Sequence, residues 1–134
     1  MIRVRVKCGR CGKSLMDEET QIDSHPSIFV TAKVGAKSGK LHLSSVYGSY
    51  QIRPAVDMKK GAIARFFCPH CRKEMMGSRR CEKCDARMIP LPLLEGGLVQ
   101  ICSRRGCKKH CLEFEDPEAE LRAFYGAYSN YYKG

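Results

Sequence analysis

Three cysteine pairs, each with two residues between its members, constrain this sequence more than any other feature. These three narrow pairs are Cys8/Cys11, Cys68/Cys71 and Cys81/Cys84. A fourth pair, Cys102/Cys107, follows them in the chain and is wider, with four residues between its members. Two cysteines so spaced can supply neighbouring corners of a metal tetrahedron from one tight turn. Gly9, Gly12 and Pro69 suit such turns, because glycine allows positive φ and proline fixes its own φ. The pattern predicts two metal sites, each formed by four cysteines.

Metal binding also explains how a chain with no Trp and few aromatic residues can be stable. A small hydrophobic core usually needs additional cross-links, either disulfides or bound metal ions. The chain has an odd number of cysteines, nine, and no apolar run typical of a signal peptide, so we expect reduced thiolates in the cytoplasm. No stretch is apolar enough to cross a membrane, and we expect no membrane partner. We expect two zinc ions; iron or an iron–sulfur cluster is the alternative cofactor.

The four pairs can be divided between two sites in two ways. In one arrangement the first pair joins the second, and the third joins the fourth. In the other, the second pair joins the third, and the first joins the fourth. We favour the first arrangement, because each pair of strands then ends on its own metal ion. His110 and Cys111 are alternative ligands beside the fourth pair, and we expect both to flank the site without binding.

Short apolar and β-branched segments between the pairs predict strands. These segments lie at residues 1–7, 28–34, 41–53, 61–67, 88–94 and 98–101. A Gly96-Gly97 turn joins the last two segments into a hairpin. Residues 14–27 are polar and are predicted to form a loop. The fold class is therefore small, β-rich and metal-stabilised.

The expected organisation is two zinc ribbons with a β-hairpin or meander insertion and a short C-terminal helix. The first ribbon spans residues 1–77 with the insertion at 20–66, the second spans 78–112, and an acidic linker with an aromatic helix spans 113–134. Asp116 and Pro117 are typical of a helix start. The apolar stripe that predicts this helix is Leu121, Phe124, Tyr125 and Tyr128.

One part of the chain carries a resemblance to a known family. Residues 81–107 read Cys-x2-Cys-x17-Cys-x4-Cys with two glycines between the halves. This segment, about a fifth of the chain, resembles the C-terminal zinc ribbons of type IA DNA topoisomerases. The resemblance implies a zinc ribbon, and the topoisomerase ribbons are associated with single-stranded DNA binding. Here the hairpin is aliphatic rather than aromatic, and the sequence contains no topoisomerase catalytic region. The rest of the chain resembles no family that we can name.

The charge of the chain favours an anionic partner. The formal net charge is +10. A zinc ion bound by four thiolates carries about −2, so two sites lower the net charge to about +6. Such a chain can bind an acidic protein or nucleic acid. The candidate nucleic-acid contacts are Arg72, Lys73, Arg79, Arg80, Arg104, Arg105, Lys108 and Lys109.

The function that we expect is a structural one. Structural zinc sites are closed and leave no open position for a substrate. The sequence has no Ser-His-Asp order, phosphate loop or His-Glu-x-x-His motif, and we assign no catalytic residue. We therefore expect an accessory or interaction protein with a protein partner, such as a small subunit or assembly factor of a larger complex. The alternative is a nucleic-acid-binding zinc ribbon protein that uses the basic face of residues 72–109.

Overall fold

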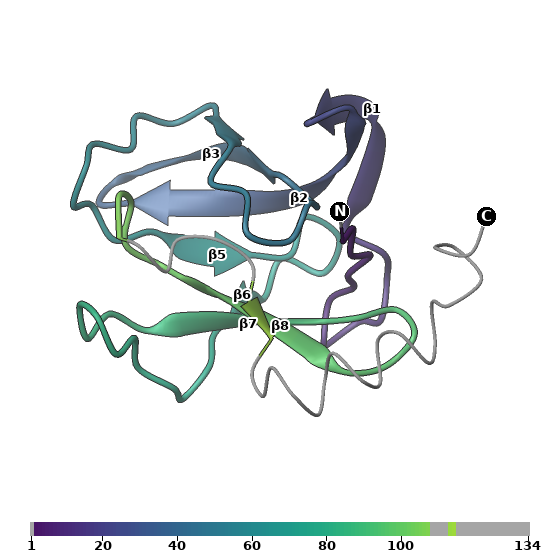
Figure 1. Ribbon diagram of the computed structural model, residues 1–134. Coiled ribbons are helices and arrows are strands. Elements are labelled where there is room, and N and C mark those ends of the chain that lie inside the picture. The colour runs from purple at the N-terminus through teal and green to yellow at the C-terminus, as the bar shows by residue number, and fades with distance from the viewer. Residues whose placement is uncertain (1, 108–112, 115–134) are drawn as a thin grey trace.

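The computed structural model describes residues 2–107 and the backbone of residues 113–114, and within them it has two antiparallel sheets (Figure 1). The larger sheet contains β1 (Met16–Ile22), β2 (His25–Val34), β3 (Lys37–Leu43), β4 (Ile52–Pro54), β5 (Arg65–Phe67) and β6 (Glu74–Met75). The smaller sheet contains β7 (Met88–Pro92), β8 (Leu98–Cys102) and β9 (Glu113–Phe114). The described part of the chain is thus small and β-rich, with two clusters of four cysteines.

Strand β2 is the centre of the larger sheet. Its residues Ile28, Val30 and Ala32 are fully buried, because they alternate along one face of the strand. One edge of β2 pairs with β3 along most of its length, across a two-residue turn that begins with Gly35 at φ 62°. The other edge pairs first with β1 and then with β5. This arrangement brings β5, which precedes the second cysteine pair, into the middle of the sheet.

The prediction of a loop at residues 14–27 is wrong, because β1 lies within it. Only Ile22 of this strand is buried, so the sequence lacks the apolar alternation that indicates a strand. Strand β1 pairs with β2 through a register irregularity between Asp17 and Gln21. The turn that joins the two strands, Asp23-Ser24, has both residues at positive φ (55° and 64°), as tight hairpins require.

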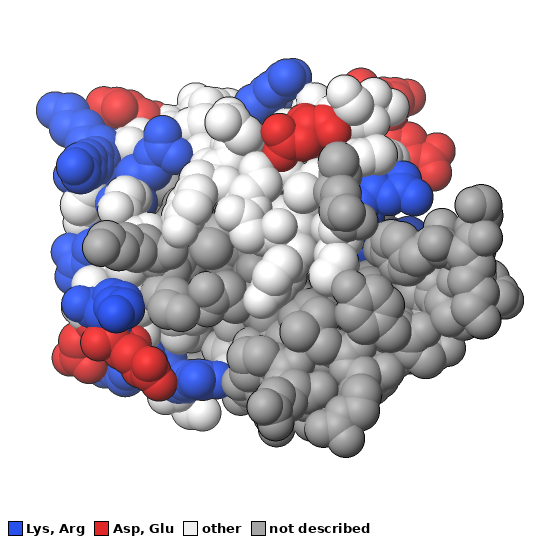
Figure 2. All heavy atoms as spheres, viewed as in Figure 1, with Lys and Arg blue, Asp and Glu red and all other residues white. Residues whose placement is uncertain are grey.

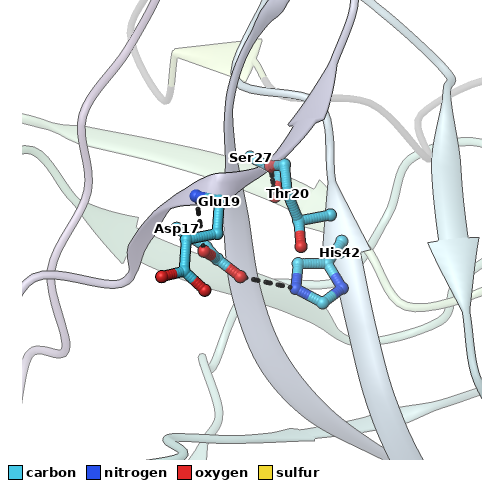
Figure 3. A network of polar contacts seen from close by, with 5 residues as sticks. All are labelled: Asp17, Glu19, Thr20, Ser27 and His42. Atoms are coloured by element: carbon cyan, nitrogen blue, oxygen red, sulfur yellow. Dashed lines mark hydrogen bonds and ion pairs between the residues drawn. The ribbon is translucent and has the colours of Figure 1, made fainter.

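A polar network holds this edge strand in place (Figure 3). The Asp17 carboxylate accepts a hydrogen bond from the backbone N–H of Glu19 at 3.0 Å and lies 3.0 Å from Nε2 of His42 on β3. The Ser27 hydroxyl of β2 donates to the backbone carbonyl of Thr20 at 2.6 Å. Burial alone would raise the pKa of Asp17, but the interactions with His42 and the backbone N–H groups of Glu19 and Thr20 together outweigh it, and the pKa is lowered. The network therefore ties β1 to both of its neighbours.

The N-terminal strap, which we define as residues 2–7, joins the two sheets. It alternates buried Val4 and Val6 with exposed arginines, as predicted for a strand. The N–H of Val4 donates to the Ser45 carbonyl at 2.9 Å, beside the larger sheet. The N–H of Lys7 donates to the carbonyl of Pro92, on β7, also at 2.9 Å. Because its partners change from one sheet to the other, the strap forms isolated bridges rather than a regular strand.

Both predicted ribbon segments contribute to one hydrophobic core. Val6 and Phe66 from residues 1–77 lie in the same buried cluster as Leu91, Val99 and Ile101 from residues 78–112. Each of these side chains is 0–2% exposed. Cys8 and Cys68 of the first cysteine cluster lie in this core, whereas the second cysteine cluster forms a separate small cluster with Ala86 and Met88.

Two further predictions can be placed. The hairpin at residues 88–102 is confirmed: β7 and β8 pair from Met88↔Cys102 to Pro92↔Leu98. The predicted helix beginning at Asp116 lies outside the described residues. Among the described residues, no helix is long and apolar enough to cross a membrane.

Candidate metal centres

The first centre consists of Cys8, Cys11, Cys68 and Cys71. Its four Sγ atoms all lie within 4.8 Å of one another. The Sγ atoms of Cys8 and Cys71 are 3.8 Å apart, and those of Cys11 and Cys68 are also 3.8 Å apart. Sulfurs this close and from two different turns can hold one metal ion. The first cysteine pair thus meets the second, although 56 residues of chain separate them.

The second centre consists of Cys81, Cys84, Cys102 and Cys107. Its Sγ atoms also lie within 4.8 Å of one another. Cys81 and Cys107 are 3.7 Å apart at Sγ, and Cys84 and Cys102 are 3.4 Å apart. The structure therefore has the first of the two arrangements that the sequence allows. His110 and Cys111 lie outside the described residues.

The three narrow cysteine pairs share one backbone conformation. In each, the N–H of the first cysteine donates to the carbonyl five residues later, and the N–H four residues after that cysteine donates back to its carbonyl. These bonds measure 2.7–3.0 Å, with Lys13, Lys73 and Ala86 as the first acceptors and Gly12, Arg72 and Asp85 as the returning donors. Each turn therefore fixes its two sulfurs on the same side, ready to bind one ion.

Backbone N–H groups also point at the leading sulfurs. Two residues after the first cysteine of each narrow pair, an N–H donates to its Sγ; the donors are Arg10 and His70 at 3.3 Å and Lys83 at 3.4 Å. The fourth pair repeats this feature, because the N–H of Arg104 lies 3.4 Å from Cys102 Sγ. Donors aimed at sulfur stabilise the thiolate, which is the form that binds metal.

The residue after each narrow pair has positive φ. Gly12 has φ 76°, but Arg72 and Asp85 occupy the same position with φ 64° and 63°. A residue with a Cβ is disfavoured in this region, so the returning hydrogen bond and the shared fold hold these two in place. The sequence indicated the turn at Gly12, and gave no glycine signal for the other two.

The pKa values of the cysteines differ within each centre. For Cys8, burial alone would raise the pKa, but N–H donors from Cys11 and Arg10 outweigh it and lower the pKa to about 7. For Cys84, burial is likewise outweighed, chiefly by the N–H of Ala86, and the pKa is lowered to about 6. Burial raises the pKa of Cys68 to about 11 and raises that of Cys102 as well. Each centre thus holds one readily ionised thiol, which can receive a metal ion first.

The two centres lie at opposite ends of one segment. Strand β5 leads directly into Cys68 of the first centre, whereas the residues before β5 pair with the fourth cysteine pair through the bridge Ile63↔Arg104. In Figure 1 the green segment after β8 lies beside the start of β5. An extended chain from residue 63 to residue 68 spans roughly 16 Å.

The predicted nucleic-acid contacts are divided between the neighbourhoods of the two metal centres. Arg72 and Lys73 directly follow Cys71 of the first centre, whereas Arg104 and Arg105 lie between two cysteines of the second. Arg79 and Arg80 precede the second centre, and Lys108 and Lys109 lie outside the described residues. Figure 2 shows Lys and Arg gathered along the left margin of the molecule, with acidic residues among them.

Two neighbouring clefts beside the second centre were not predicted. Both are lined by Cys84 and Arg104, and their volumes are about 440 and 430 Å³. Sequence reasoning missed them because they combine residues before β5 with residues from both knuckles of the second centre. Comparison with protein-family models, with curated proteins and with solved structures found no match for this chain.

Proposed function

We propose that both centres bind zinc and that the chain is a closed, zinc-stabilised interaction protein. The sulfur separations carry this proposal. Four sulfurs placed tetrahedrally at about 2.3 Å from a zinc ion lie about 3.8 Å from one another. The four Sγ–Sγ distances of 3.8, 3.8, 3.7 and 3.4 Å agree with this value to within about 0.4 Å. The donor set, four thiolates from tight turns, is also typical of structural zinc.

The same distances bear on the iron alternatives. In an iron–sulfur cluster the cysteines are shared among several iron atoms, so their sulfurs lie farther apart than sulfurs that share one ion. The 4.8 Å limit within each centre therefore favours a single ion. A single iron needs the same four thiolates as zinc, and metal analysis distinguishes the two.

The strands support two zinc ribbons. In the second centre, one knuckle precedes β7 and the other follows β8, and β9 completes a three-stranded sheet. In the first centre, one knuckle lies between the paired residues Lys7 and Ser14, and the other joins β5 to β6. Strands β1 to β4 then form an insertion between the two knuckles of the first ribbon. The hairpin at residues 88–102 lies between the two knuckles, as in a zinc ribbon, but its aliphatic side chains depart from the aromatic pattern of the topoisomerase ribbons.

The closed centres favour a structural role. Four cysteines per ion leave no coordination position for water or substrate, so the ions contribute folding energy rather than catalysis. The function of the molecule then depends on the partners that its surface binds. An accessory protein, such as a small subunit or assembly factor, fits this chemistry. Thiolates that bind metal favour a reducing compartment, and we propose the cytoplasm.

Nucleic-acid binding is the second candidate. The cleft of about 430 Å³ favours it, because among the described residues four cationic side chains and no acidic one line this cleft. These cations are Lys60, Lys83, Arg104 and Arg105. Part of their charge balances the thiolates of the adjoining centre, and Arg72 and Lys73 lie at the other end of the core. An interaction with protein is therefore the better-supported proposal.

Metal analysis of the natively purified protein tests the proposal. We expect one zinc ion per centre and no visible absorption, since zinc is colourless and iron–thiolate sites absorb strongly. A chelator should abolish the β-sheet circular dichroism, and added zinc should restore it, because metal binding and folding are coupled. Iron in place of zinc, or full β-sheet signal after complete removal of metal, would refute the proposal.

A further inference from the structure

The larger of the two clefts, which we call the arginine cleft, lies between β5–β6 and the knuckle Cys81–Cys84. Its volume is about 440 Å³. The wall near β5 is formed by Ile63, Ala64 and Arg65, and the opposite wall includes Ala86, Arg87 and Ile89. Its lining thus contains both apolar and cationic side chains. This combination favours a partner that is both apolar and anionic.

The apolar part of this lining is unusually exposed. Among the described residues, the exposed large hydrophobic side chains are Tyr50, Ile63 and Met76. Two of these three, Ile63 (47% exposed) and Met76 (52% exposed), line the arginine cleft. Exposed apolar side chains that meet at a concave site are typical of interaction surfaces. The cleft therefore offers burial to an apolar group.

The charged part of the lining has an excess of guanidinium groups. Arg65 binds Glu74 at 2.6 Å, so this pair is already neutral. Arg80, Arg87 and Arg104 remain, with Asp85 as the other acidic residue of the cleft. Arg80 donates to the backbone carbonyl of Asp85 at 3.2 Å, and Arg104 donates to that of Gly61 at 3.0 Å and also to the thiol of Cys84. Their positive charge is therefore not paired with a carboxylate among the described residues.

The negative charge of the zinc–thiolate centre does not by itself cancel the excess positive charge of the arginine cleft. A zinc–thiolate centre carries about −2, and Cys84 lines both clefts. Lys60, Lys83 and Arg105 surround Cys84 on the side of the smaller cleft. These three cations can offset the charge of the centre. Arg80 and Arg87, on the other side, are then available to an anionic group, and Arg104, which also contacts Cys84, keeps an Nε donor without a hydrogen-bond partner among the described residues.

Two buried polar atoms in the wall of the cleft have no hydrogen-bond partner among the described residues. These atoms are the Ser103 hydroxyl oxygen and Nε of Arg104. Ser103 is only 1% exposed, so the unmet hydrogen bond costs folding energy. A hydrogen-bond acceptor is the kind of group that would satisfy both of these donors. A carboxylate is such a group and also matches the guanidinium fork.

We infer that the arginine cleft binds an acidic segment of a partner protein that carries an aliphatic side chain. The carboxylates bind Arg80, Arg87 and Arg104, and the aliphatic side chain packs on Ile63 and Met76. This inference rests on the proposed function, because it specifies the partner of the interaction protein. A single-stranded nucleic acid is a poorer match, since the described part of the chain contributes no aromatic ring to the cleft on which bases could stack.

A binding titration with the full, zinc-loaded chain tests the inference. The probe is a short fluorescein-labelled peptide of glutamate and leucine, and binding is measured by fluorescence anisotropy. Control peptides of glutamate with serine, and of lysine with leucine, test the apolar and the charged contribution separately. We expect the glutamate–leucine peptide to bind most tightly, the glutamate–serine peptide to bind more weakly and the lysine–leucine peptide not to bind. Absence of binding by the first peptide would overturn the inference.

Matched variants locate the binding site. Arg87→Ala should weaken binding about tenfold, as expected for a charged hydrogen bond. Ile63→Ser should weaken it about fivefold through lost apolar contact. Arg53→Ala and Tyr50→Ser replace the same kinds of exposed side chain outside the cleft and should leave the affinity unchanged. Equal losses in the matched variants would refute the cleft as the binding site.

Two further measurements separate the possible failures. A labelled single-stranded oligonucleotide that binds more tightly than the peptide, and loses affinity in Arg87→Ala, would replace the acidic partner with nucleic acid. Zinc content and circular dichroism of every variant show whether the metal centres are intact. A folded protein with both zinc ions and no peptide binding contradicts this inference alone. A protein without metal contradicts the proposed function.

Discussion

Substitution of Cys81 by serine removes one sulfur from the second centre. Cys81 is 4% exposed, and its Sγ lies 3.7 Å from that of Cys107. A structural zinc ion contributes about 10–16 kcal/mol, so an equal share for each of four sulfurs is about 3 kcal/mol. A domain of this kind has a net stability of about 5–15 kcal/mol. The loss is therefore a large fraction of the total.

The effect of Cys81→Ser on the rest of the fold depends on the hydrophobic core that the two ribbon segments share. Ile89 and Leu91, beside the second centre, lie in the same buried cluster as Val6 and Phe66. We therefore expect Cys81→Ser to lower the stability of the whole described body, rather than to unfold the C-terminal half alone. Urea unfolding followed by circular dichroism should show one transition at a lower midpoint, and the zinc content should fall by one ion.

A matched control lies one position along the same knuckle. Glu82 is exposed, with 77% of its side chain accessible, and its nearest cation, Arg79, is 3.9 Å away. Glu82→Ala should change the stability by less than about 0.5 kcal/mol, as is usual for surface positions. If Cys81→Ser kept both zinc ions and the midpoint of the control, the metal would not be the source of stability.

Three further predictions follow from the structure. Protons compete with zinc for the thiolates, so the zinc affinity, measured by competition with a colorimetric chelator, should fall as the pH is lowered, and it should fall more steeply once the pH passes below about 7 and about 6, where the metal-free thiols of Cys8 and Cys84 also become protonated; an affinity that did not change with pH would contradict thiolate ligands. Gly77→Ala should destabilise the protein by about 1–3 kcal/mol in urea unfolding, because a Cβ would lie 2.9 Å from a backbone carbonyl of β7; an unchanged midpoint would contradict the packing of this turn. Asp17→Asn should cost up to about 1 kcal/mol at neutral pH. Because the pKa of Asp17 is lowered in the fold, this difference should disappear as the pH falls through that pKa, and a difference that persists in strong acid would refute the assignment.

The sequence predicted the parts of this fold that have local patterns. The Gly96-Gly97 turn, with φ of 106° and 92°, and the apolar residues on both sides of it correctly predicted the hairpin of β7 and β8. The spacing of the cysteines predicted the knuckles, and the strands between them favoured the grouping that the structure has. Strand β1 was missed because it is a polar edge strand with one buried residue, and edge strands of this kind resemble loops in sequence.

The features that escaped prediction depend on contacts between distant residues. Nothing near Arg72 or Asp85 indicated a left-handed backbone, since neither is glycine, and the repeated hydrogen bonds of the knuckle impose it. The arginine cleft combines Ile63, Met76 and Arg87 from three segments, none of which has a motif of its own. Their common position depends on the pairing of residues 61–64 with residues 103–105, which no local pattern encodes.

The strap of residues 2–7 determines when the molecule can be completed during synthesis. Its backbone bonds reach Ser45 and then Pro92, and the chain continues directly into Cys8. When the strap leaves the ribosome, Cys68 and Cys71 have not yet been synthesised, and β7, which contains Pro92, follows later still. The strap therefore lacks some of its partners until β7 has been made. Until then the earliest two thiols are exposed to oxidants and to competing metals. Contacts over such long sequence separations slow folding, so the strap is made well before its partners and is held in place only after Pro92 has been made.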